Sequence, residues 1–288
     1  MKILVIGSTG QVARALLRQA GAHDVIAVGR PQIDLANPTG LADIVGQVAP
    51  DAIINAAAYT AVDQAEDEFD AARALNETGP AALARVAEAR RLPFLHISTD
   101  YVFNGLGGAP YAETADTAPL NVYGQTKADG EKAVMNINPA ALIVRTSWVY
   151  ASEGNNFVRT MLRLGADRDQ LNVVEDQIGR PTEAHSLADA LLSLAEQMRG
   201  GASGGLLHVA NSGEASWRDL AEAATSGAGM TTQINGIPTS AYPTRARRPG
   251  DTRLDLSKAR NEYGIVLPDW QASLQTFLEM MGVSGRRA

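Results

Sequence analysis

A tyrosine and a lysine four residues apart are the side chains in this sequence best suited to acid–base chemistry. Of the seven tyrosines, only Tyr123 is followed by a lysine at this spacing, at Lys127. On a helix the two side chains share one face, so the ammonium can favour the ionised form of the phenol. The pair therefore predicts a proton donor whose pKa is lowered toward neutrality. A solvated helix turn is the alternative.

The first residues of the chain predict a strand, a glycine turn and a helix. Residues 2–6 are mostly apolar and β-branched, and helical spacing of apolar residues follows the turn. The turn residues Gly7, Gly10, Gln11 and Val12 would let a pyrophosphate approach the helix N-terminus, whose free N–H groups favour an anion. Ala13 stands where the usual pattern has a third glycine. A dinucleotide site is predicted, with an ordinary β–α turn as the alternative.

The end of the second expected strand, residues 24–28, predicts which nicotinamide cofactor binds. Gly29 and Arg30 follow it, where NAD-binding proteins usually carry an acidic residue for the ribose 2′-hydroxyl. A guanidinium there can bind a 2′-phosphate, which favours NADPH and leaves NADH as a weaker cofactor. Asp34 and Leu35 are expected near the adenine. A solvated Arg30 is the alternative.

Composition limits the classes of protein. The chain has 288 residues, 45% of them hydrophobic, which is enough for a full core. It has no cysteine, which excludes disulfides and thiolate metal sites, and its net charge of −7 argues against nucleic-acid binding. The four histidines are scattered, so no metal ligands are predicted. The first apolar segment is too short for a signal peptide or a membrane span, so we expect a cytoplasmic protein without a membrane partner.

Further buried strands are expected at residues 52–55, 93–98 and 141–145, alternating with helices. This alternation predicts an α/β fold with a doubly wound, parallel, Rossmann-type sheet, in which ligands bind beyond the carboxyl ends of the strands. The cofactor-binding candidates after the strand at 52–55 are Ala57, Ala58, Tyr59 and Thr60. We expect a cofactor domain over residues 1–150 and a smaller, mainly substrate-binding domain over residues 151–288, with some segments recrossing to the first.

Longer strings of residues carry a resemblance to a known family. They are Gly7-x-x-Gly10-Gln11, the run from Asn55 to Glu66, Ser98-Thr99-Asp100-Tyr101-Val102-Phe103, the run from Pro119 to Lys127, Arg145-Thr146-Ser147-Trp148-Val149-Tyr150, Asn155-Asn156-Phe157, the run from Asp176 to Thr182 and Arg248-Pro249-Gly250. Together they resemble the dTDP-4-dehydrorhamnose reductases of the extended short-chain dehydrogenase/reductase superfamily. The likeness spans nearly the whole chain.

The resemblance implies reduction of the C4 ketone of dTDP-4-dehydro-β-L-rhamnose to dTDP-β-L-rhamnose by NAD(P)H, in dTDP-rhamnose biosynthesis. By this likeness Tyr123 is the acid, Lys127 holds the nicotinamide ribose and lowers the phenol pKa, and Thr99 donates to the carbonyl oxygen. Asp100 and Trp148 would contact the sugar. Core or strand-end roles are the alternatives for Thr99 and Trp148.

A nucleotide diphosphate substrate calls for basic side chains. The candidates are Arg245, Arg247, Arg248 and Arg253 in one Pro/Gly-rich loop, with Arg180 as a further one; a solvated charge run is the alternative. Some relatives hold Mg²⁺ between subunits through acidic residues, which makes Mg²⁺ and a homodimer further expectations, although no metal ligand is assigned in this sequence.

Two other functions stay open. A related nucleotide-sugar epimerase or dehydratase would use the same Tyr–Lys chemistry but regenerate its cofactor within each cycle. A non-catalytic NADP-binding subunit, resembling the β subunit of methionine adenosyltransferase, would share the fold. The presence of Thr99, Tyr123 and Lys127 favours an enzyme.

Overall fold

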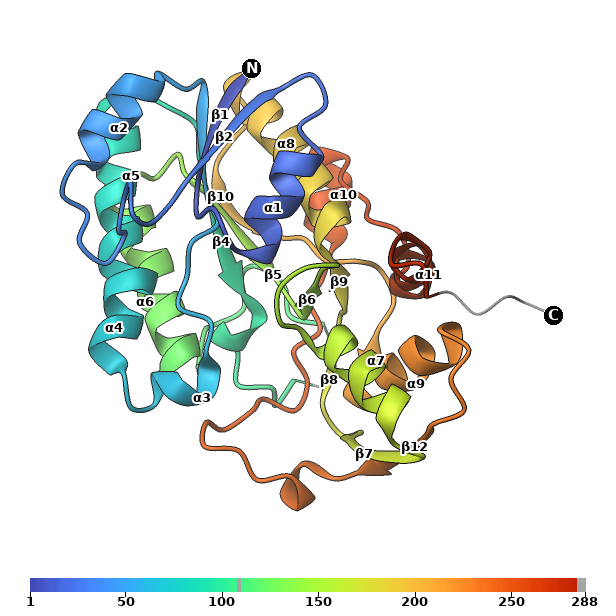
Figure 1. Cartoon of the computed structure of the whole chain (residues 1–288). Coiled ribbons are helices and arrows are strands. Elements are labelled where there is room, and N and C mark those ends of the chain that lie inside the picture. Colours follow the sequence, from blue (N-terminus) through green and yellow to red (C-terminus); the bar gives the residue numbers. More distant parts are fainter. Residues whose placement is uncertain (108–109, 284–288) are drawn as a thin grey trace.

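A parallel sheet of six strands forms the centre of the larger lobe in the computed structural model, which describes residues 1–107 and 110–283 (Figure 1). The strand order is β10-β5-β4-β3-β1-β2, and every pairing within this sheet is parallel. The strands are β1 (Lys2–Ile6), β2 (Asp24–Val28), β3 (Ala52–Asn55), β4 (Phe94–Thr99), β5 (Leu142–Thr146) and β10 (Gly205–His208). Since β2 and β3 flank β1 on opposite sides, the order reverses there, which confirms the doubly wound, Rossmann-type fold.

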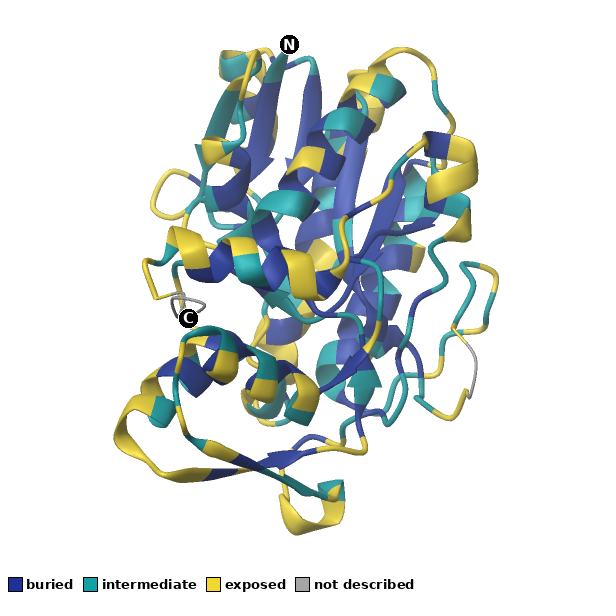
Figure 2. Cartoon of the chain, turned by 90° about the vertical axis from the view of Figure 1, so that its right-hand side faces the viewer, coloured by how far each residue is buried: buried dark blue, intermediate teal, exposed yellow. Residues whose placement is uncertain are grey.

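Successive side chains of a strand point to opposite faces, and β1 shows why its sequence is apolar throughout. Ile3 and Val5 enter one core, and Leu4 and Ile6 enter another on the opposite face. The first core is covered by α1 (Gln11–Arg18), α8 (Ala184–Arg199) and α10 (Ser257–Tyr263); the second is covered by α2 (Leu41–Val48), α5 (Gly79–Ala89) and α6 (Val122–Ile137). The strands β1, β3, β4 and β5 are accordingly mostly dark blue in Figure 2, whereas the edge strand β2 has no buried residue.

Short elements connect β3 to α5 and β4 to α6. They are α3 (Val62–Ala65), α4 (Phe69–Arg73), a π-helical segment (Ala74–Thr78) and a 3₁₀ turn (Asp100–Val102). No helix in the described ranges is both long and apolar enough to cross a membrane.

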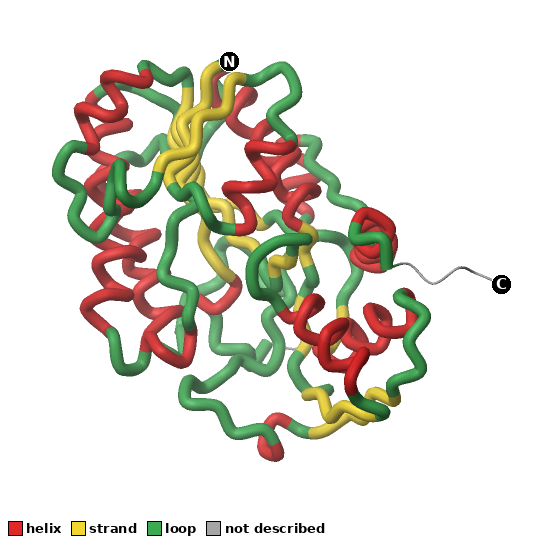
Figure 3. The backbone as a smooth tube through the Cα atoms, viewed as in Figure 1, coloured by secondary structure: helices red, strands yellow, loops and turns green. Residues whose placement is uncertain are grey.

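The smaller lobe contains α7 (Phe157–Asp167), α9 (Trp217–Gly227), α11 (Trp270–Met280) and the parallel pair β7 (Gln170–Val174) and β12 (Gln233–Ile237). Two pairs of very short strands join the lobes: β6 (Val149–Tyr150) with β9 (Thr182–Glu183), and β8 (Ile178–Gly179) with β11 (Ala215–Ser216). A 3₁₀ turn (Thr239–Ala241) follows β12. Figure 3 shows the long loop that leaves β12, runs along the lower side of the molecule and returns to α10.

The second half of the chain contributes to both lobes. Helix α8 packs on α1 and strand β10 extends the large sheet, whereas α7 and α9 pack on each other in the smaller lobe. The division at residue 150 therefore marks where the chain first leaves the larger lobe, and the assignment of a substrate-binding role to the rest stays a prediction.

Candidate active site

A cleft of about 440 Å³ lies where β1, β3, β4 and β5 end. This is the position at which open parallel sheets bind their ligands, next to the reversal of strand order. Its wall consists of residues that follow or end these strands, together with one face of α6 and the start of the smaller lobe: Thr9, Gly10, Gln11, Val12, Ala56, Ala57, Ala58, Thr60, Ile97, Ser98, Thr99, Tyr123, Lys127, Thr146, Ser147, Trp148, Val149, Gly154 and Asn155.

Most residues predicted from the sequence meet in this cleft. Those in its wall are Gly10, Gln11, Val12, Ala57, Ala58, Thr60, Thr99, Tyr123, Lys127 and Trp148. Those that are not in its wall are Gly7, Arg30, Asp34, Leu35, Tyr59 and Asp100. The cleft therefore joins the predicted phosphate turn to the predicted acid.

The capped first turn of α6 fixes Tyr123. The Asn121 side chain accepts from the Gly124 N–H at 2.8 Å, and Glu66 accepts from the Val122 N–H at 2.9 Å, so two N–H groups of the helix start are satisfied. A Cβ on Gly124 would fall 2.2 Å from the Tyr101 carbonyl oxygen. Only glycine lets the helix come this close to the end of β4, and this approach places Tyr123 beside Thr99.

Lys127 lies one turn further along α6 and is buried. Its Nζ donates to the Ile97 carbonyl at 2.6 Å and lies 3.4 Å from Nε2 of His96. Burial lowers the pKa of Lys127 to about 8, although Glu131 on the next turn acts to raise it. At neutral pH the ammonium form still predominates, held by a backbone carbonyl at the rim of the cleft.

His96 is neutral and its tautomer is fixed. Asn55 accepts from the Ala57 N–H at 3.2 Å, so its amide nitrogen donates to Nδ1 of His96 at 2.9 Å and the ring proton is on Nε2. Burial and the charge of Lys127 keep the pKa of His96 well below its usual value. His96 is thus a neutral packing partner of Lys127.

The phenol of Tyr123 differs from the expectation. Burial raises its pKa to about 12, and the charge of Asp100 acts in the same direction, whereas only the neighbouring Thr99 hydroxyl acts to lower it. The prediction that Lys127 lowers this pKa toward neutrality is wrong, because burial dominates and the ammonium donates to the Ile97 carbonyl. A raised pKa keeps the phenol protonated, which is the form that a proton donor needs.

Thr99, the last residue of β4, contacts Asp100, the first residue of the following 3₁₀ turn. The Thr99 hydroxyl donates to Oδ1 of Asp100 at 3.0 Å, and its oxygen accepts from the Tyr101 N–H at 3.2 Å. Asp100 is only 2% exposed, and burial raises its pKa to about 7. Thr99 faces the cleft, whereas Asp100 lies behind it, so its contact with a sugar remains a prediction.

Trp148 belongs to an aromatic cluster, of which the sequence predicted Trp148 but not its partner Trp217. Its ring stacks on Trp217, with centroids 3.5 Å apart and an interplanar angle of 5°, and Phe157 packs on Trp217 at 4.6 Å. A Cβ on Gly179 would fall 2.5 Å from the Trp148 ring, so this neighbour must be glycine. Trp217 begins α9 in the smaller lobe and supports Trp148 without lining the cleft, and no local pattern in the sequence predicts this contact.

The predicted phosphate turn combines close packing with an uncapped helix start. Gly7 has a φ of 108°, and a Cβ there would fall 3.1 Å from the Ala57 N, so the turn packs directly on the small residues after β3. No side chain caps the N-terminus of α1, which leaves its first N–H groups for an anion. Gln11 accepts from the Asn156 amide at 2.9 Å and so ties the turn to α7.

The three residues predicted around the adenosine half, and Tyr59 after β3, lie at different depths. Arg30 is exposed beside the turn, since its neighbour Gly29 packs against Ser8. Asp34 accepts from the Ala36 N–H at 3.0 Å in a local turn. Leu35 is buried in the core, and Tyr59 donates its phenol proton to Glu68 at 2.8 Å. None of these contacts tests a cofactor-binding role.

The arginines predicted for a diphosphate are largely engaged with acidic side chains or carbonyls. Arg245 pairs with Asp67, Arg248 with Asp63 at 2.6 Å, and Arg253 with Asp251 at 2.7 Å and Glu214 at 2.8 Å. Arg180 donates to the Leu254 carbonyl at 2.8 Å, and the carbonyl of Arg247 accepts from Asn121. Within the described residues, Nη1 of Arg248 is buried without a hydrogen-bond partner, which makes Arg248 the strongest of these candidates.

A buried ion pair supports the floor of the site. Arg145 on β5 and Glu131 on α6 form two hydrogen bonds of 2.9 and 2.6 Å, and the Ser98 hydroxyl donates to the same carboxylate at 2.5 Å. Both charges are almost fully buried. Tyr123, Lys127 and Glu131 follow one another at successive turns of α6, so this pair fixes the helix face that carries the first two.

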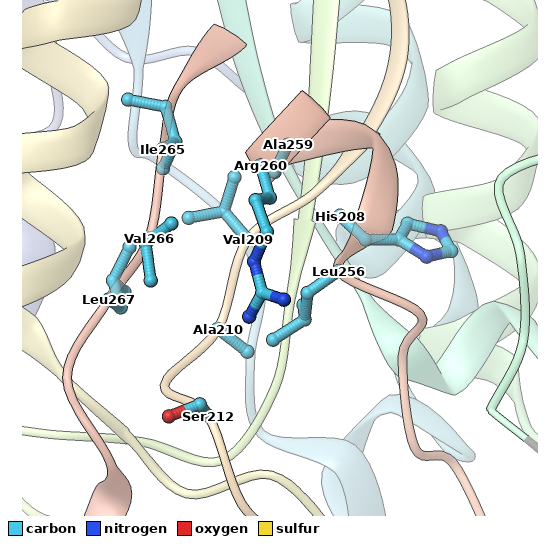
Figure 4. A pocket seen from close by; sticks show the side chains of 10 residues that line it. All are labelled: His208, Val209, Ala210, Ser212, Leu256, Ala259, Arg260, Ile265, Val266 and Leu267. Atoms are coloured by element: carbon cyan, nitrogen blue, oxygen red, sulfur yellow. The ribbon is translucent and has the colours of Figure 1, made fainter. Parts of the chain in front are cut away.

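Elsewhere, the described residues contain no group of three or more His, Asp or Glu side chains that could hold a metal ion. A second pocket, of about 20 Å³, is large enough for one water molecule only. Figure 4 shows Arg260 reaching between Leu256 and Ala210 in this pocket, among apolar neighbours. It lies apart from the residues of the cleft.

The sheet, the glycine turn and the Tyr–Lys pair beside the cleft define the chain as a Rossmann-type protein of the class that includes reductases and epimerases. The family model described as "RmlD substrate binding domain" matches residues 1–283. The dTDP-4-dehydrorhamnose reductase of Sinorhizobium fredii is 42% identical over 296 residues, covering 100% of both chains. That of Escherichia coli K12 is 44% identical over 290 residues, covering 96% of this chain and 97% of the relative.

Among solved structures, the dTDP-4-dehydrorhamnose reductase of Bacillus anthracis in complex with NADP is 33% identical. It superposes with a TM-score of 0.92 over 97% of this chain and 99% of that one. The chain belongs to the dTDP-4-dehydrorhamnose reductase family.

Proposed function

We propose that this protein reduces the C4 ketone of dTDP-4-dehydro-β-L-rhamnose to the hydroxyl of dTDP-β-L-rhamnose, with NADPH as the reductant. The observation that carries the proposal is that Thr99, Tyr123 and Lys127 share one cleft with the phosphate turn and Trp148. The names of the close relatives, and the NADP complex of one of them, support the substrate and the cofactor.

The residues of the cleft fit a dinucleotide. The close packing of Gly7 on Ala57 and the uncapped start of α1 leave room and donors for the pyrophosphate, and Lys127 would hold the nicotinamide ribose. NADPH supplies a hydride when bound. The nucleotide sugar would then lie toward Trp148 and the smaller lobe, which gives that lobe its proposed substrate-binding role.

Tyr123 would give its proton to the ketone oxygen as negative charge develops there. Its raised pKa, about 12, keeps the proton in place until the oxygen becomes basic enough to take it. Thr99 would donate a second hydrogen bond to the same oxygen, an oxyanion-stabilising role. Lys127, with a pKa of about 8, would be mostly protonated at neutral pH and would hold the nicotinamide ribose from the same face of α6.

The finer assignments follow from the sequence. Arg30 would favour NADPH over NADH, since it is exposed beside the phosphate turn and no carboxylate takes its place. A cytoplasmic location and a homodimer are predictions that rest on composition and family likeness. Mg²⁺ gains no support from the side chains described, and we do not include it in the proposed activity.

The stoichiometry of cofactor oxidation tests the proposal. With the purified protein, dTDP-4-dehydro-L-rhamnose and NADPH, we expect one NADPH oxidised for each dTDP-L-rhamnose formed. Product that forms without net oxidation of NADPH would indicate an epimerase or dehydratase. NADPH binding without turnover of the sugar nucleotide, together with a co-purifying partner protein, would indicate a binding subunit.

A further inference from the structure

A chain of side-chain hydrogen bonds runs from the C-terminal half of the protein to Thr99. The hydroxyl of Thr252 donates to Oδ2 of Asp100 at 2.5 Å, and the hydroxyl of Thr99 donates to Oδ1 of the same carboxyl at 3.0 Å. Thr252 and Asp100 are each 2% exposed and Thr99 is 6% exposed. Thr99 in turn lies close enough to Tyr123 to act on its pKa.

Backbone hydrogen bonds on both sides hold Thr252 in this position. The Thr252 N–H donates to the Ile178 carbonyl at 3.0 Å, and the flanking Asp251 N–H donates to the Gly105 carbonyl at 3.1 Å. The Arg253 carbonyl accepts from the Tyr111 N–H at 2.7 Å. Backbone hydrogen bonds therefore hold residues 251–253 between the loop after β4 and the strand β8. The Thr252 side chain has little freedom to leave Asp100.

The hydroxyl of Thr99 can donate its single proton to only one acceptor at a time. A threonine hydroxyl has one proton and two lone pairs, and one lone pair of Thr99 already accepts the Tyr101 N–H. While Asp100 is ionised and accepts the Thr99 proton, that proton is not available to an oxygen in the cleft. When Asp100 is protonated on Oδ1, it donates to Thr99 instead, and the Thr99 proton can turn toward the cleft.

We propose that Thr252 is a positioning residue of the active site, because its hydroxyl, acting through the carboxyl group of Asp100, determines whether the Thr99 proton points to Asp100 or into the cleft. The inference rests on the proposed reductase function, in which Thr99 donates to the ketone oxygen. By donating to Oδ2, Thr252 both stabilises the carboxylate and leaves Oδ1 as the oxygen that can share a proton with Thr99.

The groups around Asp100 place its titration near neutrality. Burial raises its pKa to about 7, whereas the hydroxyls of Thr252 and Thr99 and the N–H groups of Asp100 and Tyr101 lower it. The phenols of Tyr101 and Tyr123 also face it, and each is affected by its charge. Loss of the Thr252 donor should therefore raise the pKa of Asp100 further, because the carboxylate loses its shortest hydrogen bond.

The test compares Thr252→Val, which keeps the shape but removes the donor, with Thr252→Ser, which keeps the donor. We measure kcat at saturating NADPH and sugar nucleotide from about pH 6 to about pH 9, the range in which a carboxyl of this kind titrates. In the parent, kcat should fall as the pH rises through the pKa of Asp100. In the Val variant this fall should move up by about one pH unit, since a hydrogen bond to a charged group is worth about 1.5 kcal/mol or more. The Ser variant should restore the parent profile.

A fall at the same pH in the parent and in Thr252→Val overturns the proposal, as does a Ser variant that moves the profile as far as the Val variant. A uniform loss of kcat at all pH values, without displacement, marks a purely structural role and also overturns it. The titration of Lys127 is followed separately, through the pH dependence of NADPH binding. This dependence should be the same in the parent and in both variants.

A ¹³C NMR titration of the Asp100 carboxyl in the parent and in Thr252→Ser does not depend on the folding of the Val variant or on turnover. Titration near neutrality in both supports the inference. Titration near the usual aspartate pKa, about 4, overturns it. A parent that shows this titration but reduces no sugar nucleotide refutes the proposed function alone, so the two failures are distinguishable.

Discussion

Trp148 and Trp217 stack face to face, with ring centroids 3.5 Å apart, although they belong to different lobes. Trp148 follows the carboxyl end of β5 in the large sheet and has a left-handed φ of 48°, whereas Trp217 is the first residue of α9. The indole N–H of Trp217 donates to Gln177 at 3.1 Å, which fixes the orientation of its ring. The stack therefore connects the part of the cleft that Trp148 lines to the smaller lobe.

Replacing Trp217 should affect the sugar nucleotide and not the cofactor. We expect Trp217→Ala to raise KM for the sugar nucleotide about 2- to 10-fold, because an aromatic pair contributes about 0.5–1.5 kcal/mol beyond burial and Trp148 loses its support. Trp148→Ala should act in the same direction. Trp270→Phe, a change to a core tryptophan outside the cleft wall, is the control and should alter only stability. Unchanged sugar kinetics in both alanine variants would place the stack outside the substrate site.

Removing the phenol hydroxyl tests the acid. Tyr123→Phe should lower kcat by about 10²- to 10⁴-fold while NADPH still binds, since proton donation contributes by this amount. The control is Tyr101→Phe, because this second phenol lies edge-on to Tyr123 at 5.8 Å but does not line the cleft. Steady-state kinetics and NADPH fluorescence titration measure both effects. Near-normal kcat in Tyr123→Phe would remove the residue from the mechanism.

The buried ammonium of Lys127 should make stability depend on pH above neutrality. Its pKa is lowered from 10.5 to about 8, so between these values the unfolded chain binds a proton that the native chain does not. The free energy of unfolding should therefore rise with pH across this window, by up to about 3 kcal/mol from Lys127. This gain in stability should be lost again as the pH falls through 8.

Lys127→Met is the comparison, because it removes the titrating group. In urea unfolding at about pH 7 and about pH 10, the free energy of unfolding of the parent should increase relative to that of the variant at the higher pH. A difference between the two proteins that stays constant over this range would mean that Lys127 keeps its ordinary pKa. The variant should also bind NADPH more weakly if Lys127 holds the ribose.

The buried pair of Arg145 and Glu131 should be costly to break. Glu131→Gln is expected to lower the free energy of unfolding by about 3–5 kcal/mol, because it leaves the guanidinium uncompensated in the core. Asp129→Asn on the same helix is the matched control: its pair with Lys132 is exposed, at 3.6 Å, and should matter by less than about 1 kcal/mol. Equal effects in urea unfolding would contradict the assignment of Glu131 as a structural support for α6.

Arg30 should set the cofactor preference. Arg30→Ala is expected to weaken NADPH binding about 10- to 100-fold and to leave NADH binding nearly unchanged, and high salt should reduce the parent's preference. The exposed Arg168, outside the cleft wall, serves as a charge control. A companion Gly29→Asp change is unsuitable, because a Cβ there would fall 2.6 Å from the Ser8 hydroxyl oxygen in the phosphate turn. Equal use of the two cofactors before and after the change would show that Arg30 points into solvent.

Local patterns in the sequence predicted the parts of the site that depend on one element. The strand-and-turn pattern around Gly7 and Gly10 and the helical spacing of Tyr123 and Lys127 are visible within a few residues, and parallel strands bring their ends together. The family strings extended the predictions to Thr99 and Trp148, which also lie in the cleft.

Contacts between distant segments were not predictable in this way. Thr252 reaches Asp100 across 152 residues, and Trp217 reaches the site only through the packing of α9. The raised pKa of Tyr123 depends on burial and on the commitment of Lys127 to a backbone carbonyl, neither of which spacing reveals. The acidic partners of Arg245 and Arg248 lie after β3, far away in the chain.

Tracing the hydride tests the central claim most directly. The protein is supplied with dTDP-4-dehydro-L-rhamnose and NADPH carrying deuterium at the transferable position of the nicotinamide, and the sugar product is analysed by mass spectrometry and NMR. We predict one deuterium per product molecule, located at C4, with an equal amount of NADP⁺ formed. Deuterium at another carbon, product without deuterium, or label that stays in the cofactor while product accumulates would contradict the assignment as a C4 ketone reductase.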